Sequence, residues 1–172
     1  MPNPAMPNPA EPNPAEADGT ALRALLEDHE GRRAFAYRDT VGKLTIGVGR
    51  NLTDRGLEEG EIDFLLANDI AVAAAACADI FGPDFRGWPQ SRRHALISMA
   101  FNMGGPRLAG FRRMRAAIAA HDWTAAAAEA LDSRWAAQTG RRAQHIARML
   151  RDDRPLHFPQ RTIRRDHVRD PD

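Results

Sequence analysis

Residues 29–53 read HEGRRAFAYRDTVGKLTIGVGRNLT, and this stretch decides the fold of the chain. A helical pattern precedes Gly31, and Asp18–Thr20 offer side chains that suit its N-cap. Two short strand patterns follow, over about 34–39 and 43–49, around a turn that contains a glycine. The stretch therefore predicts a helix that leads directly into a small, twisted hairpin.

Two carboxylates and a hydroxyl fall within this stretch. Glu30 ends the helical pattern, Asp39 follows nine residues later, and Thr45 lies six residues beyond Asp39. Cleaving a glycosidic bond requires one group that protonates the leaving oxygen and another that activates water. A helix end and a hairpin could present such groups across a cleft, although an acidic chain often contains Glu and Asp at this spacing by chance.

The composition indicates one soluble globular domain. The chain has 172 residues, of which 43% are hydrophobic and 27% charged, and its net charge of +1 gives no reason to expect a nucleic-acid partner. Lys43 is the only lysine. The single cysteine, Cys77, excludes a disulfide framework within the chain, and its alanine-rich helical surroundings favour a buried, inert thiol over a reactive one. The six histidines lack metal-ligand spacing, so we expect no metal and no cofactor.

No membrane insertion or export signal is expected from the sequence. The longest apolar run, residues 71–78, is far shorter than the ~20 residues that a transmembrane helix needs. The N-terminal residues contain no apolar signal core.

Three regions are predicted along the chain. Residues 1–17 repeat P-N-P-A and predict a disordered tail, which serves either as a spacer or as a partner-binding segment. Residues 18–155 form the domain, with strand patterns first and helical patterns after, including a helix over 123–131 that Asp122 can cap. Residues 156–172 are polar and rich in arginine, either solvated or able to hold anionic wall polymers or phosphates. Strands followed by helices argue for an α+β fold, with a small antiparallel sheet lobe and a larger helical lobe.

The context of the carboxylates makes the pattern specific. Over residues 20–152 the chain carries, in order, the segments E-G, Y-R-D-T, T-I-G-V-G, M-A-F-N-M-G, G-F, S-R-W, Q-T and R-A. With these segments it resembles the phage-type lysozymes, or endolysins, of glycoside hydrolase family 24. The resemblance implies a lysozyme-like α+β fold and a muramidase that cuts the β-1,4 bond between N-acetylmuramic acid and N-acetylglucosamine in peptidoglycan.

The resemblance also implies a role for each catalytic candidate. Glu30 would be the general acid, Asp39 would position and deprotonate water on the opposite face of the sugar, and Thr45 would help to hold that water. The implied outcome is inversion of the anomeric centre, for which the carboxyl groups need to be about 6.5–9.5 Å apart. Arg142 corresponds to an arginine near the catalytic glutamate, where a cation would favour the ionised form of Glu30.

Four residues are expected to bind substrate in the family register. Phe101 is either a core residue or a platform for a sugar ring, and Asn102 is expected to donate a hydrogen bond to a sugar amide. Asn51 and Met114 fall at positions that face the cleft. Trp135 is expected to serve in packing, with its indole N–H bonded nearby.

One departure from the family concerns the second strand. Arg50 stands where the family often has a histidine, and Asp69 stands where the partner of that histidine would be. We therefore predict an Arg50–Asp69 ion pair that links the sheet lobe to the long helix, with little sensitivity to pH because arginine stays charged.

The expected role is that of a monomeric phage lysozyme that lyses its bacterial host. It would accumulate in the host cytoplasm and reach peptidoglycan in the periplasm with the help of a membrane pore. Two alternatives stay open: a lytic transglycosylase, which needs no water-activating aspartate, and a non-catalytic peptidoglycan-binding component of the virion.

Overall fold

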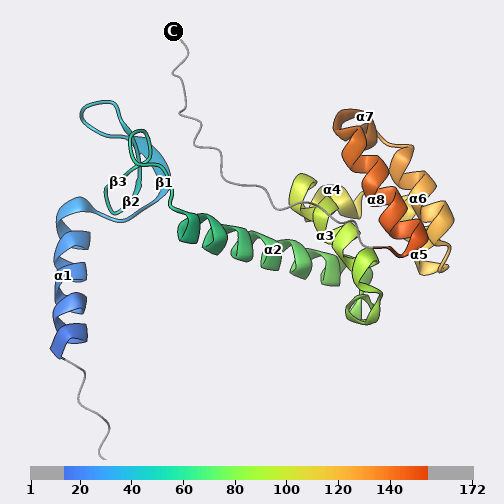
Figure 1. The fold of residues 1–172 in the computed structure, drawn as a ribbon, viewed down its shortest axis with the longest axis horizontal. Helices are drawn as coiled ribbons and strands as arrows, with labels where there is room; N and C mark the ends of the chain where they lie inside the picture. Colours follow the sequence, from blue (N-terminus) through green and yellow to red (C-terminus); the bar gives the residue numbers. More distant parts are fainter. Residues whose placement is uncertain (1–13, 155–172) are drawn as a thin grey trace, which may run out of the picture. The chain divides into compact units, whose positions relative to one another are not determined.

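The computed structural model describes residues 14–154, which confirm the α+β fold (Figure 1). The chain divides into two units, one of Met1–Glu58 with Asp166–Asp172 and the other of Glu59–Arg165, and each unit is described by itself. Most of the predicted N-terminal tail and the predicted C-terminal tail lie outside the described residues.

The first unit contains one helix and a small sheet. α1 spans Pro14–Glu30, β1 spans Arg33–Arg38, β2 spans Leu44–Gly47 and β3 spans Arg50–Asn51. α1 begins at Pro14 and not near Asp18–Thr20, so the last four residues of the predicted tail are helical. The physical reason is that proline, with its fixed φ and missing N–H, is well accommodated in the first turn of a helix.

The sheet is antiparallel in the order β1-β2-β3. Thr45 in the central strand lies opposite Tyr37 in β1 and Asn51 in β3. The register shifts between Arg33 and Tyr37, which marks a bulge in β1. The predicted hairpin is confirmed, but the sequence pattern did not separate β3, because two residues after a glycine turn carry no alternation to detect.

The second unit is helical. After α2 (Glu59–Phe81) come a 3₁₀ turn, η1 (Pro83–Gly87), and six further helices. These are α3 (Gln90–Met103), α4 (Gly105–Ala109), α5 (Arg112–Ala119), α6 (Trp123–Leu131), α7 (Arg134–Thr139) and α8 (Arg141–Asp152). The predicted cap of α6 is confirmed, because the carboxylate of Asp122 accepts a 2.9 Å hydrogen bond from the Ala125 N–H.

One hydrophobic core holds these helices together. α6 packs against α5 and α8, and α3 packs against α2 and α8 (Figure 1). Leu96, Met99, Leu108 and Leu150 are fully buried in this core. Cys77 is also fully buried, and the loss of hydration raises the pKa of its thiol to about 12, which confirms the prediction of an inert thiol.

α2 corrects one expectation from the sequence. Its 23 residues have a mean hydropathy of 1.7 over the most apolar window, so by length and composition it could cross a membrane. The longest uninterrupted apolar run is short, but Asp69 and Asp79 are the only charges between 64 and 81. Core helices of soluble proteins pass the same test, so this property by itself assigns α2 to neither environment.

Candidate active site

Glu30 is the last residue of α1, and its carboxylate lies against the turn between β2 and β3. Gly49 in that turn has a φ of +72°, and a Cβ placed there would lie 3.3 Å from Oε2 of Glu30. That separation is tighter than an ordinary contact, so a glycine is what allows the carboxylate to sit directly on the turn. The Glu30 side chain itself stays exposed to solvent within the described residues.

Asp39 organises the turn between β1 and β2. Its Oδ1 accepts hydrogen bonds from the N–H groups of Val41 at 3.0 Å and Lys43 at 2.8 Å. Its backbone N–H donates to the Lys43 carbonyl at 2.9 Å, and its own carbonyl accepts from Gly42 at 3.0 Å. Asp39 therefore caps its own turn, and this role occupies one of its carboxylate oxygens. No group in the described part of the chain bonds to the other oxygen, Oδ2.

Thr45 is buried, with an exposed fraction of 4%, in the middle of the sheet. Its hydroxyl donates to the carbonyl of Lys43 at 3.3 Å, and so Thr45 and Asp39 both bond to the backbone of one residue. β2 begins after the Asp39 turn and ends before the turn that contacts Glu30. Thr45 thus lies in β2, Asp39 lies in the turn before this strand, and the Glu30 carboxylate lies against the turn after it.

Asn51 takes part in a local network. Its Nδ2 donates to Oδ2 of Asp54 at 2.9 Å, and its Oδ1 accepts from the Asp54 N–H at 3.0 Å. Lys43 Nζ lies 2.9 Å from Oδ1 of Asp54. The hydrogen bonds from Lys43 and then Asn51 hold the pKa of Asp54 below its ordinary value. The amide of Asn51, predicted to bind substrate, is therefore largely used within the protein.

Two predicted interactions join residues of different units, so they stay predictions. The Nε of Arg50 donates to the Gly56 carbonyl at 3.0 Å, whereas its predicted partner, Asp69, belongs to the second unit. Arg142 also belongs to the second unit, where its Nη2 donates to the carbonyl and the hydroxyl of Ser98, both at 3.1 Å. Neither the Arg50–Asp69 ion pair nor the effect of Arg142 on Glu30 is tested by these contacts.

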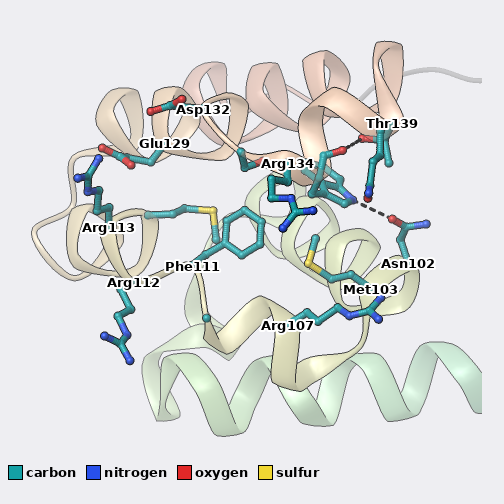
Figure 2. Close-up of a pocket in the computed structure, with 15 residues that line it drawn as sticks. Asn102, Met103, Arg107, Phe111, Arg112, Arg113, Glu129, Asp132, Arg134 and Thr139 are labelled. Carbon is teal, nitrogen blue, oxygen red and sulfur yellow. Dashed lines mark hydrogen bonds between the residues drawn. The ribbon is translucent and has the colours of Figure 1, made fainter.

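An open pocket of about 900 Å³ lies in the second unit, between α4, α5, α6 and α7 (Figure 2). Phe111 and Trp135 pack edge to face in its wall, with ring centroids 6.5 Å apart, and Met103 contributes a third apolar side chain. Arg107 and Arg134 lie on opposite sides of the pocket (Figure 2). The pocket therefore combines an apolar wall with a charged rim.

The charges on the rim are unevenly placed. Glu129, Asp132 and Arg113 gather at one end, and Asn102 and Thr139 lie at the other (Figure 2). Within residues 14–154 no hydrogen bond or ion pair engages the side chains of the four lining arginines. These are Arg107, Arg112, Arg113 and Arg134. Four guanidinium groups against two carboxylates favour an anionic ligand.

The residues predicted to bind substrate do not share one pocket. Asn102 and Met114 line the large pocket, where Met114 is only 1% exposed and so serves as buried wall. Phe101 is 46% exposed, which makes it a surface side chain of this unit, and it lines a separate cavity of about 380 Å³ with Asp69. Asn51 belongs to the first unit.

Trp135 fixes the orientation of Asn102. The indole N–H donates to Oδ1 of Asn102 at 2.8 Å, and Trp135 is 7% exposed, which confirms the prediction that it packs with its N–H bonded nearby. The Nδ2 of Asn102, which is exposed, is left to donate elsewhere, as the sequence analysis expected for a bond to a sugar amide.

Sequence reasoning missed three features of these sites. It did not find the contact of Gly49 with Glu30, the bond between Lys43 and Asp54, or the arginines of the pocket. The adjacent Arg112 and Arg113 were visible in the sequence, but nothing in the sequence places them beside Arg107 and Arg134.

Comparisons with known proteins show the family of this chain. The family model for phage lysozyme matches residues 27–152. Probable T4-type lysozyme 2 of Dictyostelium discoideum is 24% identical over 155 residues, which cover 74% of this chain and 91% of that protein. Probable T4-type lysozyme 1 of the same organism is 24% identical over 159 residues, which cover 76% of this chain and 94% of that protein.

A virion protein is also similar. The pre-baseplate central spike protein Gp5 of Enterobacteria phage T4 is 26% identical over 157 residues, which cover 76% of this chain but only 27% of that protein. Since the family match spans well over half of the sequence, the chain belongs to the phage lysozyme family and is a lysozyme-type hydrolase.

Proposed function

We propose that this lysozyme hydrolyses the β-1,4 bond between N-acetylmuramic acid and N-acetylglucosamine, inverts the anomeric centre, and acts as a monomer in bacterial lysis. The observation that carries the proposal is that Asp39 and the Glu30 carboxylate lie at the turns before and after β2, with Thr45 in that strand, all within a single unit. Glu30 is the general acid, Asp39 is the base that deprotonates water, and Thr45 helps to hold that water.

The free oxygen of Asp39 supports its role as a base. Oδ1 is fixed by two backbone N–H groups, so the carboxylate has a defined orientation without losing both of its acceptor oxygens. Oδ2 is left to accept a proton from water. A group held at one end and free at the other meets the requirement that a general base be positioned before the reaction begins.

Inversion is proposed from the spacing along β2. Leu44–Gly47 rises by about 3.3 Å per residue, so the turns at its two ends are separated by roughly 10 Å. The Glu30 carboxylate lies against one of those turns, and the Asp39 carboxylate lies in the other. Such an arrangement suits a pair of carboxyl groups with a sugar and a water between them, as inverting glycosidases require.

The large pocket of the second unit is proposed to bind peptidoglycan. Its apolar wall of Phe111 and Met103 suits the face of a sugar ring, and Asn102 Nδ2 can donate to an acetamido carbonyl. The peptide stems of peptidoglycan carry carboxylates, for which Arg107 and Arg134 supply guanidinium groups that have no partner among residues 14–154. Arg107→Ala should raise KM more than it lowers kcat, whereas Arg141→Ala, on an exposed part of α8 outside the pocket, should change neither.

Delivery follows from the proposed role in lysis. The protein would collect in the cytoplasm of the host bacterium and cross to the periplasm once the membrane has been breached. A second candidate, suggested by the similarity to a baseplate spike protein, is a lysozyme carried in the virion. Purified particles digested and analysed by mass spectrometry distinguish the two, because peptides of this chain should be absent from particles if it acts only in lysis.

Product analysis on purified peptidoglycan tests the reaction. Wild type should release muropeptides with a reducing N-acetylmuramic acid, and proton NMR at early times should show the α-anomer, since inversion of a β-bond yields it. Glu30→Gln serves as the inactive control.

Three other results would each change the assignment. Anhydro-muropeptides would identify a lytic transglycosylase, and an initial β-anomer would contradict inversion. Binding to peptidoglycan without any release of products from the wild type would identify a non-catalytic component.

A further inference from the structure

We propose that Lys43 and Asp54 form a strap that positions the proposed base Asp39 and the proposed water-holding Thr45, an inference that rests on the function proposed above. Neither residue is proposed to touch the reacting atoms. Both act through the backbone of residue 43, to which the two proposed catalytic side chains bond.

The backbone of Lys43 is the point where Asp39 and Thr45 meet. Its N–H donates to Oδ1 of Asp39 at 2.8 Å, and its carbonyl accepts from the Thr45 hydroxyl at 3.3 Å and from the Asp39 N–H at 2.9 Å. A displacement of the backbone of this one residue therefore moves the carboxylate and the hydroxyl together. Since Asp39 lies just after β1, the sheet ladder alone does not fix it.

The side chain of Lys43 connects the backbone of residue 43 to the segment after β3. Nζ lies 2.9 Å from Oδ1 of Asp54, and Oδ2 of Asp54 accepts from Asn51 at 2.9 Å. Asn51 is itself held in the sheet opposite Thr45. Both oxygens of Asp54 are thus engaged, one by the residue before β2 and the other by β3.

Two hydrogen bonds show that the segment after β3 runs beside the start of β2. The Leu44 N–H donates to the Thr53 hydroxyl at 2.9 Å, and the Leu52 N–H donates to the Leu44 carbonyl at 2.7 Å. The Lys43–Asp54 ion pair continues this series of contacts by one residue, toward the Asp39 turn. As an exposed ion pair it adds little to global stability, so its effect should appear in positioning and not in unfolding.

Because Lys43 is the only lysine, amine chemistry tests the strap directly. Acetylation removes the charge of Nζ, whereas reductive methylation keeps it. We expect acetylation to lower kcat on soluble peptidoglycan fragments about ten-fold with KM nearly unchanged, and methylation to lower it less than about two-fold. Lys43→Arg keeps a cation that neither reagent modifies, so it reports the effect of modifying the N-terminal amine alone.

Substitutions at Asp54 provide an independent test. Asp54→Ala should lower kcat by about the same factor as acetylation, and Asp54→Glu should restore much of it. The matched control is Arg55→Ala, which removes the neighbouring Arg55–Glu58 ion pair, also 2.9 Å long and exposed. Amide hydrogen exchange gives a readout that does not depend on activity: Asp54→Ala should accelerate exchange at Val41 and Lys43, and Arg55→Ala should not.

The outcomes distinguish a failure of the proposed strap from a failure of the proposed reaction. If the wild type hydrolyses no peptidoglycan, the proposed function fails, and exchange at Val41 and Lys43 still reports whether Asp54 holds the turn. If the wild type is active while acetylated protein and Asp54→Ala keep normal kcat and normal exchange, the strap is wrong. A loss of kcat equal to that in Arg55→Ala would also overturn it, because that loss would follow from removing any exposed ion pair here.

Discussion

Each of the two units is stabilised internally by a different kind of interaction. Between residues 19 and 58, Thr45 is the single buried residue, and its neighbours are fixed by hydrogen bonds in turns. In the second unit, side chains from most of the helices meet in one continuous hydrophobic core. The proposed chemistry is thus carried by short-range hydrogen bonds, whereas most of the buried apolar surface belongs to a region without the proposed acid or base.

The comparison predicts that activity and stability can be lost separately. Changes in the first unit should remove activity with little effect on unfolding, and changes in the core of the second unit should do the reverse. The following substitutions test this separation, beginning with the largest expected effect.

Glu30→Gln should abolish the chemistry and leave the fold intact. Removing a general acid costs about a hundred- to ten-thousand-fold in kcat, and the exposed side chain of Glu30 contributes little to burial. Glu27→Gln, one turn earlier on α1, is the matched control and should keep normal kcat. Turbidity clearing of permeabilised cells and thermal unfolding measure the two properties, and near-normal clearing by Glu30→Gln would remove Glu30 from the mechanism.

Leu96→Ala should strongly destabilise the second unit. Leu96 is fully buried in the core, and truncating such a leucine leaves a cavity that costs about 2–5 kcal/mol of unfolding free energy. Leu131→Ala, at a position 44% exposed, should cost far less. Urea unfolding measures both, and kcat per folded molecule should hardly change. Equal losses of stability in the two variants would contradict the assignment of the core.

Gly49→Ala and Gly47→Ala sharpen the comparison within the first unit. Both glycines have positive φ, +72° and +68°, so alanine costs roughly 1–2 kcal/mol of backbone strain at either position. Only at Gly49 would the new Cβ meet the Glu30 carboxylate, at 3.3 Å, whereas nothing lies within 4 Å at Gly47. Gly49→Ala should therefore lose about ten-fold more kcat than Gly47→Ala at a similar melting temperature. Equal kcat values would mean that the turn does not position Glu30.

Cys77 should produce the smallest effect, which is a decrease in the free energy of unfolding as pH rises in the alkaline range. Burial raises the pKa of its thiol from 9.0 to about 12, so between these values the unfolded chain releases a proton that the folded chain retains. The free energy of unfolding should consequently fall as pH rises above 9.0, and Cys77→Ala should remove that part of the slope. Urea unfolding at about pH 8 and about pH 10 measures it. Identical slopes in the two proteins would show that the thiol ionises equally in both states.

The proposed catalytic residues and the residues expected to bind substrate depend on the sequence over different ranges, for a physical reason. Glu30, Asp39 and Thr45 lie within sixteen residues, where a helix end, a turn and a strand determine the geometry locally. Asn102 and Phe101 are adjacent in sequence, yet they line different cavities, because neighbouring residues on α3 face different helices. Residues that are distant in sequence, such as Arg107 and Arg134, meet only after α4 and α7 have packed.

By itself, the sequence determined the order of a helix, a hairpin and a helical region, and it determined the family through motifs that are local by nature. Tertiary structure alone decided that Gly49 would meet Glu30, that Lys43 would reach Asp54, and that four arginines would surround one pocket. These contacts depend on how separate elements pack in space, and no periodicity in the chain encodes such distances.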